Sequence, residues 1–204
     1  MPPYKAIILD MGDVLFRWRP QLTTNIPITT LGQLINTDLW HDFERGKISP
    51  DECYRQLGET FSLAPDEIAT TFKQANAGLM PATEMTDLLL DIRSMHHNAE
   101  GIKFGIYMMS NISRLDYDQL REAHASYVWD VFDGIFASGY VGMRKPDRCF
   151  YELVLERVKV SPEEVVFVDD RLENVKAAEE LGMKGVHCVD IMQTSGLLRE
   201  LLQL

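Results

Sequence analysis

The sequence predicts an α/β fold in which a three-layer, Rossmann-like parallel sheet carries an inserted helical cap. Short apolar runs alternate with helical patterns from residue 102 to the end of the chain, and this alternation is typical of a parallel sheet with helices on both faces. Residues 17–98 show helix start signals instead and no convincing buried strand. We therefore expect an α/β core of residues 1–16 and 99–204, interrupted by a cap of residues 17–98.

Each element has its own signal in the sequence. The first apolar run ends on Asp10 and turns at once through Gly12, as expected of a buried parallel strand. In the cap, the segments Ser49–Glu52 and Ala64–Glu67 each place proline and acids in a first helical turn. The later strands are expected at residues 102–109, 134–137, 165–168 and 185–189, and the later helices at about 115–126, 147–158, 172–181 and 192–203.

Polar side chains follow three of these apolar runs. Asp10 ends the first run, Ser110 and Asn111 end the second, and Asp169 and Asp170 end the third. Open α/β sheets bind ligands at the carboxyl ends of their strands, so these side chains are expected to meet in one crevice. Each also has a purely structural interpretation, because aspartate caps turns and serine or asparagine caps helices.

A lysine and a pair of acids indicate the kind of ligand. Lys145 stands just before a helix that Pro146 and Asp147 open, and a positive charge beside helix N–H groups suits an anion. The alternative is an ordinary solvated lysine. Asp169 and Asp170 are adjacent carboxylates that repel each other, so a cation is their natural partner.

In this order and spacing the four segments resemble the motifs of the haloacid dehalogenase superfamily, over the whole chain. The forms Gly142–Pro146 and Val168-Asp169-Asp170-x-x-x-Asn174 are similar to those of sugar-phosphate phosphatases and of the amino-terminal phosphatase domain of soluble epoxide hydrolases. The resemblance implies a magnesium-dependent hydrolase of small phosphate esters that works through an aspartyl-phosphate.

The resemblance also assigns roles in phosphate binding. It implies that Asp10 is the nucleophile and that Lys145 neutralises charge on Asp10 and on the phosphate. Ser110, helped by Asn111, would bind the phosphoryl group. These roles suit phosphoryl transfer, which depends on positioning and charge neutralisation.

The metal assignment comes from the same resemblance. Mg²⁺ would be held by Asp10, the backbone carbonyl of Gly12 and Asp170, with Asp169 and Asn174 in support. These are oxygen donors, which a hard cation prefers.

The chain departs from the family pattern at Gly12. The family has a second aspartate here, which protonates the leaving group and later activates water. Proton transfer by such a group contributes about 10²–10⁴-fold, so we expect low activity on alkyl phosphates. Three alternatives stay open: Asp13 serves although a one-residue shift points its side chain elsewhere, a water or cap residue serves, or the substrate needs no acid.

The last alternative leads to a second function. An allylic diphosphate reacts by losing inorganic diphosphate. This is a good leaving group when magnesium neutralises its charge, so no general acid is required. The pattern Asp169-Asp170-x-x-Glu173 resembles the diphosphate-binding motif of terpene synthases and of terpene cyclases derived from haloacid dehalogenase-like domains. A third interpretation is a pseudoenzyme that binds a phosphometabolite or a protein partner.

A helical cap implies a small-molecule substrate, and the entrance to the site would be lined by residues near the start of the cap. The candidates are Phe16, Arg17, Trp18, Trp40, Phe43, Glu44 and Arg45. Arg17 and Arg45 are the best candidates for binding substrate charge. For the aromatic residues, packing between cap and core is an equally good interpretation.

Composition narrows the classes of function and of binding partner that remain. The net charge of −11 argues against nucleic-acid or anionic-membrane binding. Three scattered cysteines do not indicate a disulfide framework or a zinc site. No apolar stretch approaches the roughly 18 residues of a membrane span, and we expect a cytoplasmic protein whose partner is a phosphate or diphosphate.

Overall fold

A parallel five-stranded sheet forms the centre of the computed structural model, which describes residues 4–97 and 104–204. The strand order is β5-β4-β1-β6-β7, with all four neighbouring pairs parallel. The strands are β1 (Ala6–Leu9), β4 (Gly105–Ser110), β5 (Gly134–Ala137), β6 (Val165–Asp169) and β7 (Lys184–His187). The predicted α/β fold is confirmed; residues 102 and 103 of the expected second strand lie outside the described residues.

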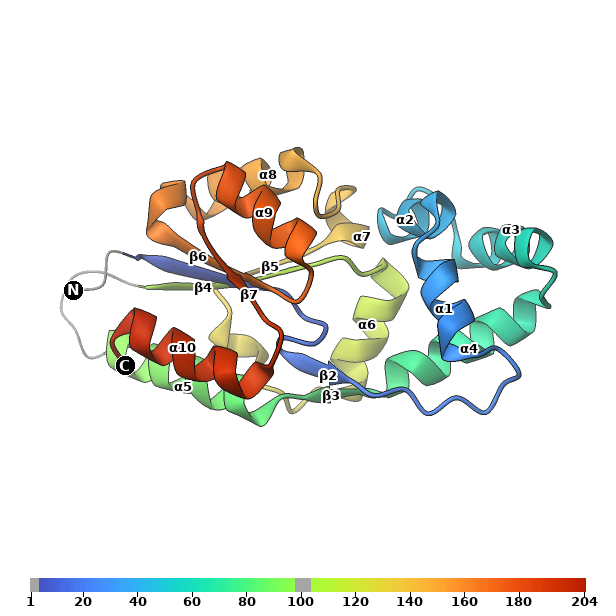
Figure 1. Cartoon of the computed structure of the whole chain (residues 1–204), viewed down its shortest axis with the longest axis horizontal. Coiled ribbons are helices and arrows are strands. Elements are labelled where there is room, and N and C mark those ends of the chain that lie inside the picture. The colour runs from blue at the N-terminus through green and yellow to red at the C-terminus, as the bar shows by residue number, and fades with distance from the viewer. Residues whose placement is uncertain (1–3, 98–103) are drawn as a thin grey trace.

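Helices cover both faces of this sheet (Figure 1). One face carries α8 (Arg148–Val158) and α9 (Leu172–Glu180), and the other carries α5 (Thr83–His97) and α10 (Ile191–Leu202). In β1, the buried Ala6 and Ile8 belong to the apolar cluster under α8 and α9, whereas Ile7 and Leu9 belong to the cluster under α5 and α10. Successive side chains of a strand point to opposite faces, so an uninterrupted apolar run fills both layers.

Short helical segments complete the core. They are α6 (Arg114–Ala123), α7 (Ser138–Val141) and two 3₁₀ turns, η1 (Trp129–Val131) and η2 (Pro162–Glu164). The cysteines Cys53, Cys149 and Cys188 are all free. Among the described residues, no helix combines the length and the apolar character that a membrane crossing requires.

Four further helices form a separate lobe beyond the carboxyl ends of the central strands (Figure 1). This helical lobe consists of α1 (Ile28–Ile35), α2 (Asp38–Glu44), α3 (Pro50–Phe61) and α4 (Pro65–Ala77). The expected helix starts are present: α3 begins at Pro50, where Ser49 Oγ accepts a hydrogen bond from Glu52 N at 3.2 Å, and α4 begins at Pro65. The lobe buries its own apolar cluster, which includes Leu57 and Phe72.

Two short strands carry the chain into and out of the helical lobe. β2 (Phe16–Trp18) and β3 (Leu79–Pro81) pair antiparallel. The sequence predicted no convincing buried strand between residues 17 and 98. β3 and most of β2 lie in this range, and each strand has a single buried residue. Each strand has only three residues, which is too short for a periodic pattern to show.

The sequence placed the end of the cap at residue 98, and the packing of α5 bears on this boundary. Met85, Leu88, Leu89 and Ile92 of α5 are buried in the cluster beneath the sheet, and α5 packs against α10. Because its apolar face covers the sheet, α5 packs as part of the core. We propose that the cap ends near Gly78, before β3.

Candidate active site

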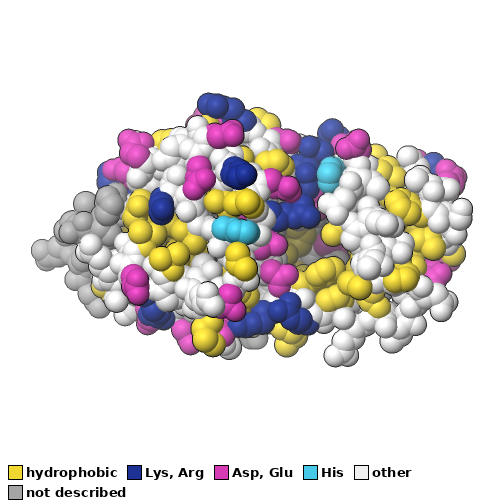
Figure 2. Space-filling view, viewed as in Figure 1, with side chains coloured by type: hydrophobic (Ala, Val, Ile, Leu, Met, Phe, Trp, Pro, Cys, Tyr) yellow, Lys and Arg dark blue, Asp and Glu magenta, His cyan; other side chains and the backbone are white. Residues whose placement is uncertain are grey.

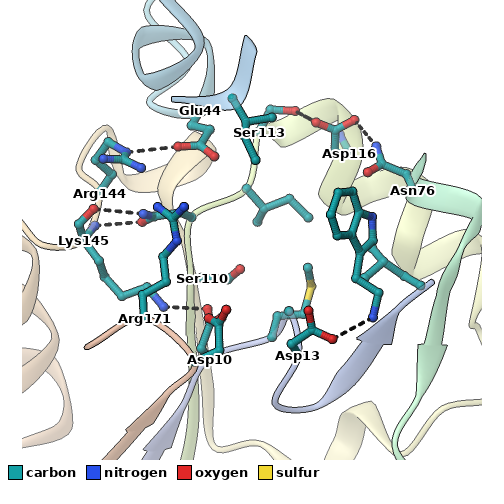
Figure 3. A pocket seen from close by; sticks show the side chains of 18 of the residues that line it. Asp10, Asp13, Glu44, Asn76, Ser110, Ser113, Asp116, Arg144, Lys145 and Arg171 are labelled. Carbon is teal, nitrogen blue, oxygen red and sulfur yellow. Dashed lines mark hydrogen bonds and ion pairs between the residues drawn. The ribbon is translucent and has the colours of Figure 1, made fainter. Parts of the chain in front are cut away.

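The site lies where three neighbouring strands end. β1 is flanked by β4 and β6, so Asp10, Ser110 and Asp169 come together at the same edge of the sheet. The backbone N–H of Asp10 donates to the carbonyl of Val168 at 2.8 Å, which extends the pairing with β6 and fixes the position of the Asp10 carboxylate. The hydroxyl of Ser110 points into the cavity above Asp10 (Figure 3).

Lys145 lies at the bottom of this arrangement and is only 1% exposed. Its ammonium donates to Asp10 Oδ1 at 2.5 Å, to Asp169 Oδ2 at 2.6 Å and to the Met109 carbonyl at 2.7 Å. An ammonium has three donors, so each donor has a partner. The buried lysine is held in one position, with its charge against the nucleophile candidate.

Asn111 positions this lysine through the backbone. Its Oδ1 accepts from Lys145 N at 2.7 Å and its Nδ2 donates to the Lys145 carbonyl at 2.9 Å. Both ends of the amide are therefore engaged with the Lys145 peptide. The structure gives Asn111 a supporting place in the cavity wall beside its predicted contact with phosphate.

Three carboxylates at this edge could hold a cation. Asp10, Asp169 and Asp170 offer oxygen atoms within 4.8 Å of one another. Burial raises the pKa of Asp10 to about 7 although Lys145 opposes this shift, and burial together with Asp169 raises the pKa of Asp170 to about 6. Burial thus disfavours the charged forms of both carboxylates, and a hard divalent cation is a partner that would favour them.

Asp169 differs from its two neighbours because its oxygens already have partners. Besides Lys145 at Oδ2, its Oδ1 accepts from Arg171 N and from Asn174 Nδ2, both at 2.9 Å. Asp10 and Asp170 line the cavity, whereas Asp169 does not. Asp169 and Asn174 therefore lie behind the carboxylates that face the cavity.

The turn after Asp10 brings Asp13 to the cavity. Asp13 has a left-handed φ of 47°, and its Oδ1 accepts from Trp18 N at 3.0 Å. Gly12 and Asp13 both line the cavity, and Asp13 lies beside Asp10 on its floor (Figure 3). The expectation that a one-residue shift turns this side chain away assumed an extended segment, and the left-handed turn removes that assumption.

A cavity of about 340 Å³ extends from these residues toward the helical lobe. It lies at the hollow between lobe and core, where lysine and arginine side chains gather (Figure 2). Its far wall is largely apolar and is formed by Trp18, Ile35, Trp40, Phe72, Ala75, Leu79 and Ile112. The site therefore joins a charged floor to an apolar chamber.

The predicted entrance residues divide into two groups. Trp18, Trp40 and Glu44 line the cavity, whereas Phe16 and Phe43 are buried in the apolar clusters of core and lobe.

Arg17 and Arg45 do not line the cavity, and the structure corrects their predicted place in it. Arg17 pairs with Glu84 at 2.7 Å and Arg45 pairs with Asp147 at 2.7 Å. These ion pairs draw the two guanidinium groups away from the cavity.

Several cavity residues were missed at the level of sequence. Arg144 forms a buried pair with Glu44 at 3.0 Å, and Arg171 follows Asp170 in the chain. Asp116 accepts from Ser113 Oγ and from Asn76 Nδ2, each at 2.7 Å. The place of Arg171 next to Asp170 was an available signal, whereas no sequence pattern joins residues as distant as Asn76 and Asp116.

Comparisons with known proteins agree with this geometry. Residues 4–182 match the haloacid dehalogenase-like hydrolase family. The chain is 49% identical over 198 residues to the sesquiterpene phosphatase astK of Aspergillus oryzae, which covers 97% of this chain and 96% of that protein. It is 41% identical over 182 residues to the drimenol cyclase drtB of Aspergillus calidoustus, which covers 89% of this chain but 33% of the cyclase.

Solved structures show the same fold. A haloacid dehalogenase-family enzyme of Bacteroides thetaiotaomicron, determined with magnesium and inorganic phosphate, superposes with a TM-score of 0.68 at 23% identity and covers 90% of this chain and 93% of that one. The family model spans most of the chain. The strand-end carboxylates, the buried lysine and the helical lobe are consistent with that family. This protein belongs to the haloacid dehalogenase-like hydrolase family.

Proposed function

We propose that the protein is a Mg²⁺-dependent phosphatase that hydrolyses a phosphate ester of an apolar, isoprenoid-sized alcohol. The observation that carries the proposal is one cavity in which Asp10 and Lys145 face an apolar wall from the helical lobe. Ligand sites commonly pair a largely apolar lining with a few well-placed polar groups. The name of the Aspergillus oryzae relative, a sesquiterpene phosphatase, supports the same class of substrate.

The residues present suit a magnesium ion. The carboxylates of Asp10 and Asp170 and the carbonyl of Gly12 would hold it, and their oxygens are the donors that Mg²⁺ prefers. When bound, the ion would neutralise phosphate charge and orient the phosphoryl group. Burial raises the pKa values of Asp10 and Asp170, so their charged forms would gain from a cation placed against them.

The chain's own groups then account for the transfer step. An oxygen of Asp10 attacks phosphorus, and the bond from phosphorus to the ester oxygen breaks. Lys145 offsets negative charge on Asp10, and the Ser110 hydroxyl donates to a phosphoryl oxygen. Water subsequently attacks phosphorus of the aspartyl-phosphate, which releases inorganic phosphate and regenerates Asp10.

The apolar wall supplies selectivity for the organic part of the substrate. Trp40 and Phe72 stack with ring centroids 4.0 Å apart, and Trp18 Nε1 donates to the Ala75 carbonyl at 3.0 Å. These contacts fix large apolar surfaces around the chamber. A hydrocarbon chain buried against them gains roughly 25 cal/mol per Å² of apolar surface removed from water.

The cyclase alternative receives less support from the geometry. In the pattern Asp169-Asp170-x-x-Glu173, Asp169 is turned toward Lys145 and Asn174. Glu173 is exposed and pairs with Arg171 at 3.3 Å, and it does not line the cavity.

Release of inorganic phosphate tests the proposal. The assay uses p-nitrophenyl phosphate and farnesyl monophosphate with and without Mg²⁺. We expect Asp10→Asn to abolish phosphate release and the magnesium-dependent binding of beryllium fluoride, which mimics an aspartyl-phosphate. The matched control is Glu173→Gln, which changes an exposed carboxylate and should leave both unchanged.

Three outcomes would contradict the hydrolase. They are full activity in Asp10→Asn, hydrocarbon or cyclic products that disappear in Glu173→Gln, and binding of phosphate esters without turnover. The second outcome would point to the cyclase and the third to a binding protein.

A further inference from the structure

Three cationic side chains lie along one wall of the cavity in an otherwise acidic protein. The net charge is −11, yet Lys145, Arg171 and Arg144 all line this cavity. Arg171 lies above Asp10, between it and the pair formed by Arg144 and Glu44 (Figure 3). Lys145 already provides the positive charge beside Asp10, so a further cation on this wall is open to a second role.

The three cations differ in how fully they are paired. Lys145 uses its three donors within the protein, and Arg144 is 7% exposed and paired with Glu44 at 3.0 Å. Arg171, in contrast, contacts Glu173 at 3.3 Å and Asn36 at 3.4 Å. These contacts are long for charge-assisted hydrogen bonds, and a guanidinium has five donors. Arg171 is thus the cation with donors left for a ligand.

The backbone holds Arg171 in this place. Its N–H donates to Asp169 Oδ1 at 2.9 Å, one residue from Asp170, which faces the cavity. Its side chain reaches Asn36 at the end of α1. The guanidinium therefore lies between the phosphoryl position at Asp10 and the helical lobe, where the next group of a substrate would pass.

The lack of an acidic side chain at Gly12 favours a substrate whose leaving group needs no proton. A phosphatase that lacks a positioned acid is slow to expel an alkoxide, which must gain a proton as it leaves. A phosphate monoester, whose second pKa is about 6, leaves as a stable anion near neutral pH. A leaving group that is itself a phosphate removes the need for the missing aspartate and places negative charge where Arg171 lies.

We propose that the substrate is an organic diphosphate and that Arg171 binds its inner phosphate, which becomes the leaving group. An oxygen of Asp10 bonds to the terminal phosphorus, and the bond from that phosphorus to the bridging oxygen breaks with its electron pair kept on the departing monoester. Water then releases inorganic phosphate from Asp10, with its protons going to solvent and phosphate. The proposal rests on the phosphatase function and specifies the substrate of that same site.

The experiment compares farnesyl diphosphate with farnesyl monophosphate, each with Mg²⁺. We expect kcat/KM for phosphate release to favour the diphosphate by about 100-fold or more, since the acid that the monophosphate requires contributes at least that much. Mass spectrometry should identify farnesyl monophosphate as the first product. In Arg171→Ala, the ratio of the two kcat/KM values should fall by about ten- to a hundredfold, the effect of losing hydrogen bonds to a charged group.

Controls separate recognition from general damage. Arg45→Ala removes a neighbouring guanidinium that is paired outside the cavity, and it should leave the ratio unchanged. Arg171→Lys should retain part of the preference, because it keeps the charge without the guanidinium fork. A preference for the monophosphate, an unchanged ratio in Arg171→Ala, or release of inorganic diphosphate would each overturn the proposal. Failure to release phosphate even from p-nitrophenyl phosphate would instead overturn the phosphatase function itself.

Discussion

Gly12 stands where the family pattern that the sequence resembles has an aspartate, and the structure shows room for the missing side chain. A Cβ atom built on Gly12 meets no atom within 4 Å. We expect Gly12→Asp to raise hydrolysis of alkyl monophosphates by as much as about 10²–10⁴-fold, the usual contribution of a positioned acid. Rates on p-nitrophenyl phosphate, whose leaving group needs no proton, should change far less. Steady-state phosphate release on both substrates measures the difference.

Gly12→Asn is the matched control, because it has the same shape without an acidic proton. An equal gain on both substrates would indicate a general structural change. No gain at all would indicate that another acid already serves. Asp13, on the cavity floor, would then be the residue to replace, as Asp13→Asn.

The convergence of site residues could be predicted from the sequence for those that stand at the ends of strands. Asp10, Ser110 and Asp170 stand at or just after strand ends, and the topology of a parallel sheet brings such positions together. Arg17 and Arg45 were misplaced because ion pairs with residues distant in sequence decide where a long side chain points. Their partners, Glu84 and Asp147, carry no local signal. The roles of the converging residues remain predictions until the variants are measured.

At the scale of elements, the crossing between core and lobe depends on a close backbone approach at Gly78. A Cβ at this position would lie 2.7 Å from both the Arg19 carbonyl oxygen and the Pro20 Cα. We expect Gly78→Ala to lower the free energy of unfolding by about 1–3 kcal/mol, the usual effect of overpacking. Urea denaturation measures the change.

Gly32 provides the matched comparison for this prediction. It lies inside α1, and a Cβ there meets nothing within 4 Å. Gly32→Ala should raise the free energy of unfolding by about 0.5–1 kcal/mol through helix propensity alone. Equal effects of the two substitutions would show that the crossing does not need this close approach.

Elements were predictable in proportion to their length and burial. The buried runs of β1 and β6 and the proline-led starts of α3 and α4 each carry a strong local pattern. The three-residue strands β2 and β3 do not. The assignment of α5 to the core follows from its packing against α10, a contact between segments about a hundred residues apart that periodicity cannot show.

For the whole molecule, the acidic cluster couples stability to pH. The pKa values of Asp10 and Asp170 are raised to about 7 and about 6, above the ordinary value of about 3.9 that applies to the unfolded chain. Between pH 4 and 7 the folded, metal-free protein therefore binds protons that the unfolded chain does not. Its free energy of unfolding should fall as pH rises through this window.

Magnesium should reverse this trend, because it competes with the same protons and its stabilising effect grows as pH rises. Thermal unfolding at pH 5, 6, 7 and 8, in EDTA and in Mg²⁺, measures both slopes. Asp170→Asn should flatten the slope in EDTA and weaken the response to the ion. A magnesium-induced shift in Tm that is the same at pH 5 and pH 8 would argue against these carboxylates as ligands.

The paired strands β2 and β3 have a consequence for how such proteins diversify. Because the chain leaves the core and returns to it through neighbouring strands, everything between them behaves as a cassette with two adjacent attachment points. Exchanging that cassette would reshape the apolar chamber of the cavity while leaving Asp10 and Lys145 in their places. New substrates can then be acquired without rebuilding the chemistry, and a chimaera joined at these two strands is the natural way to transplant selectivity.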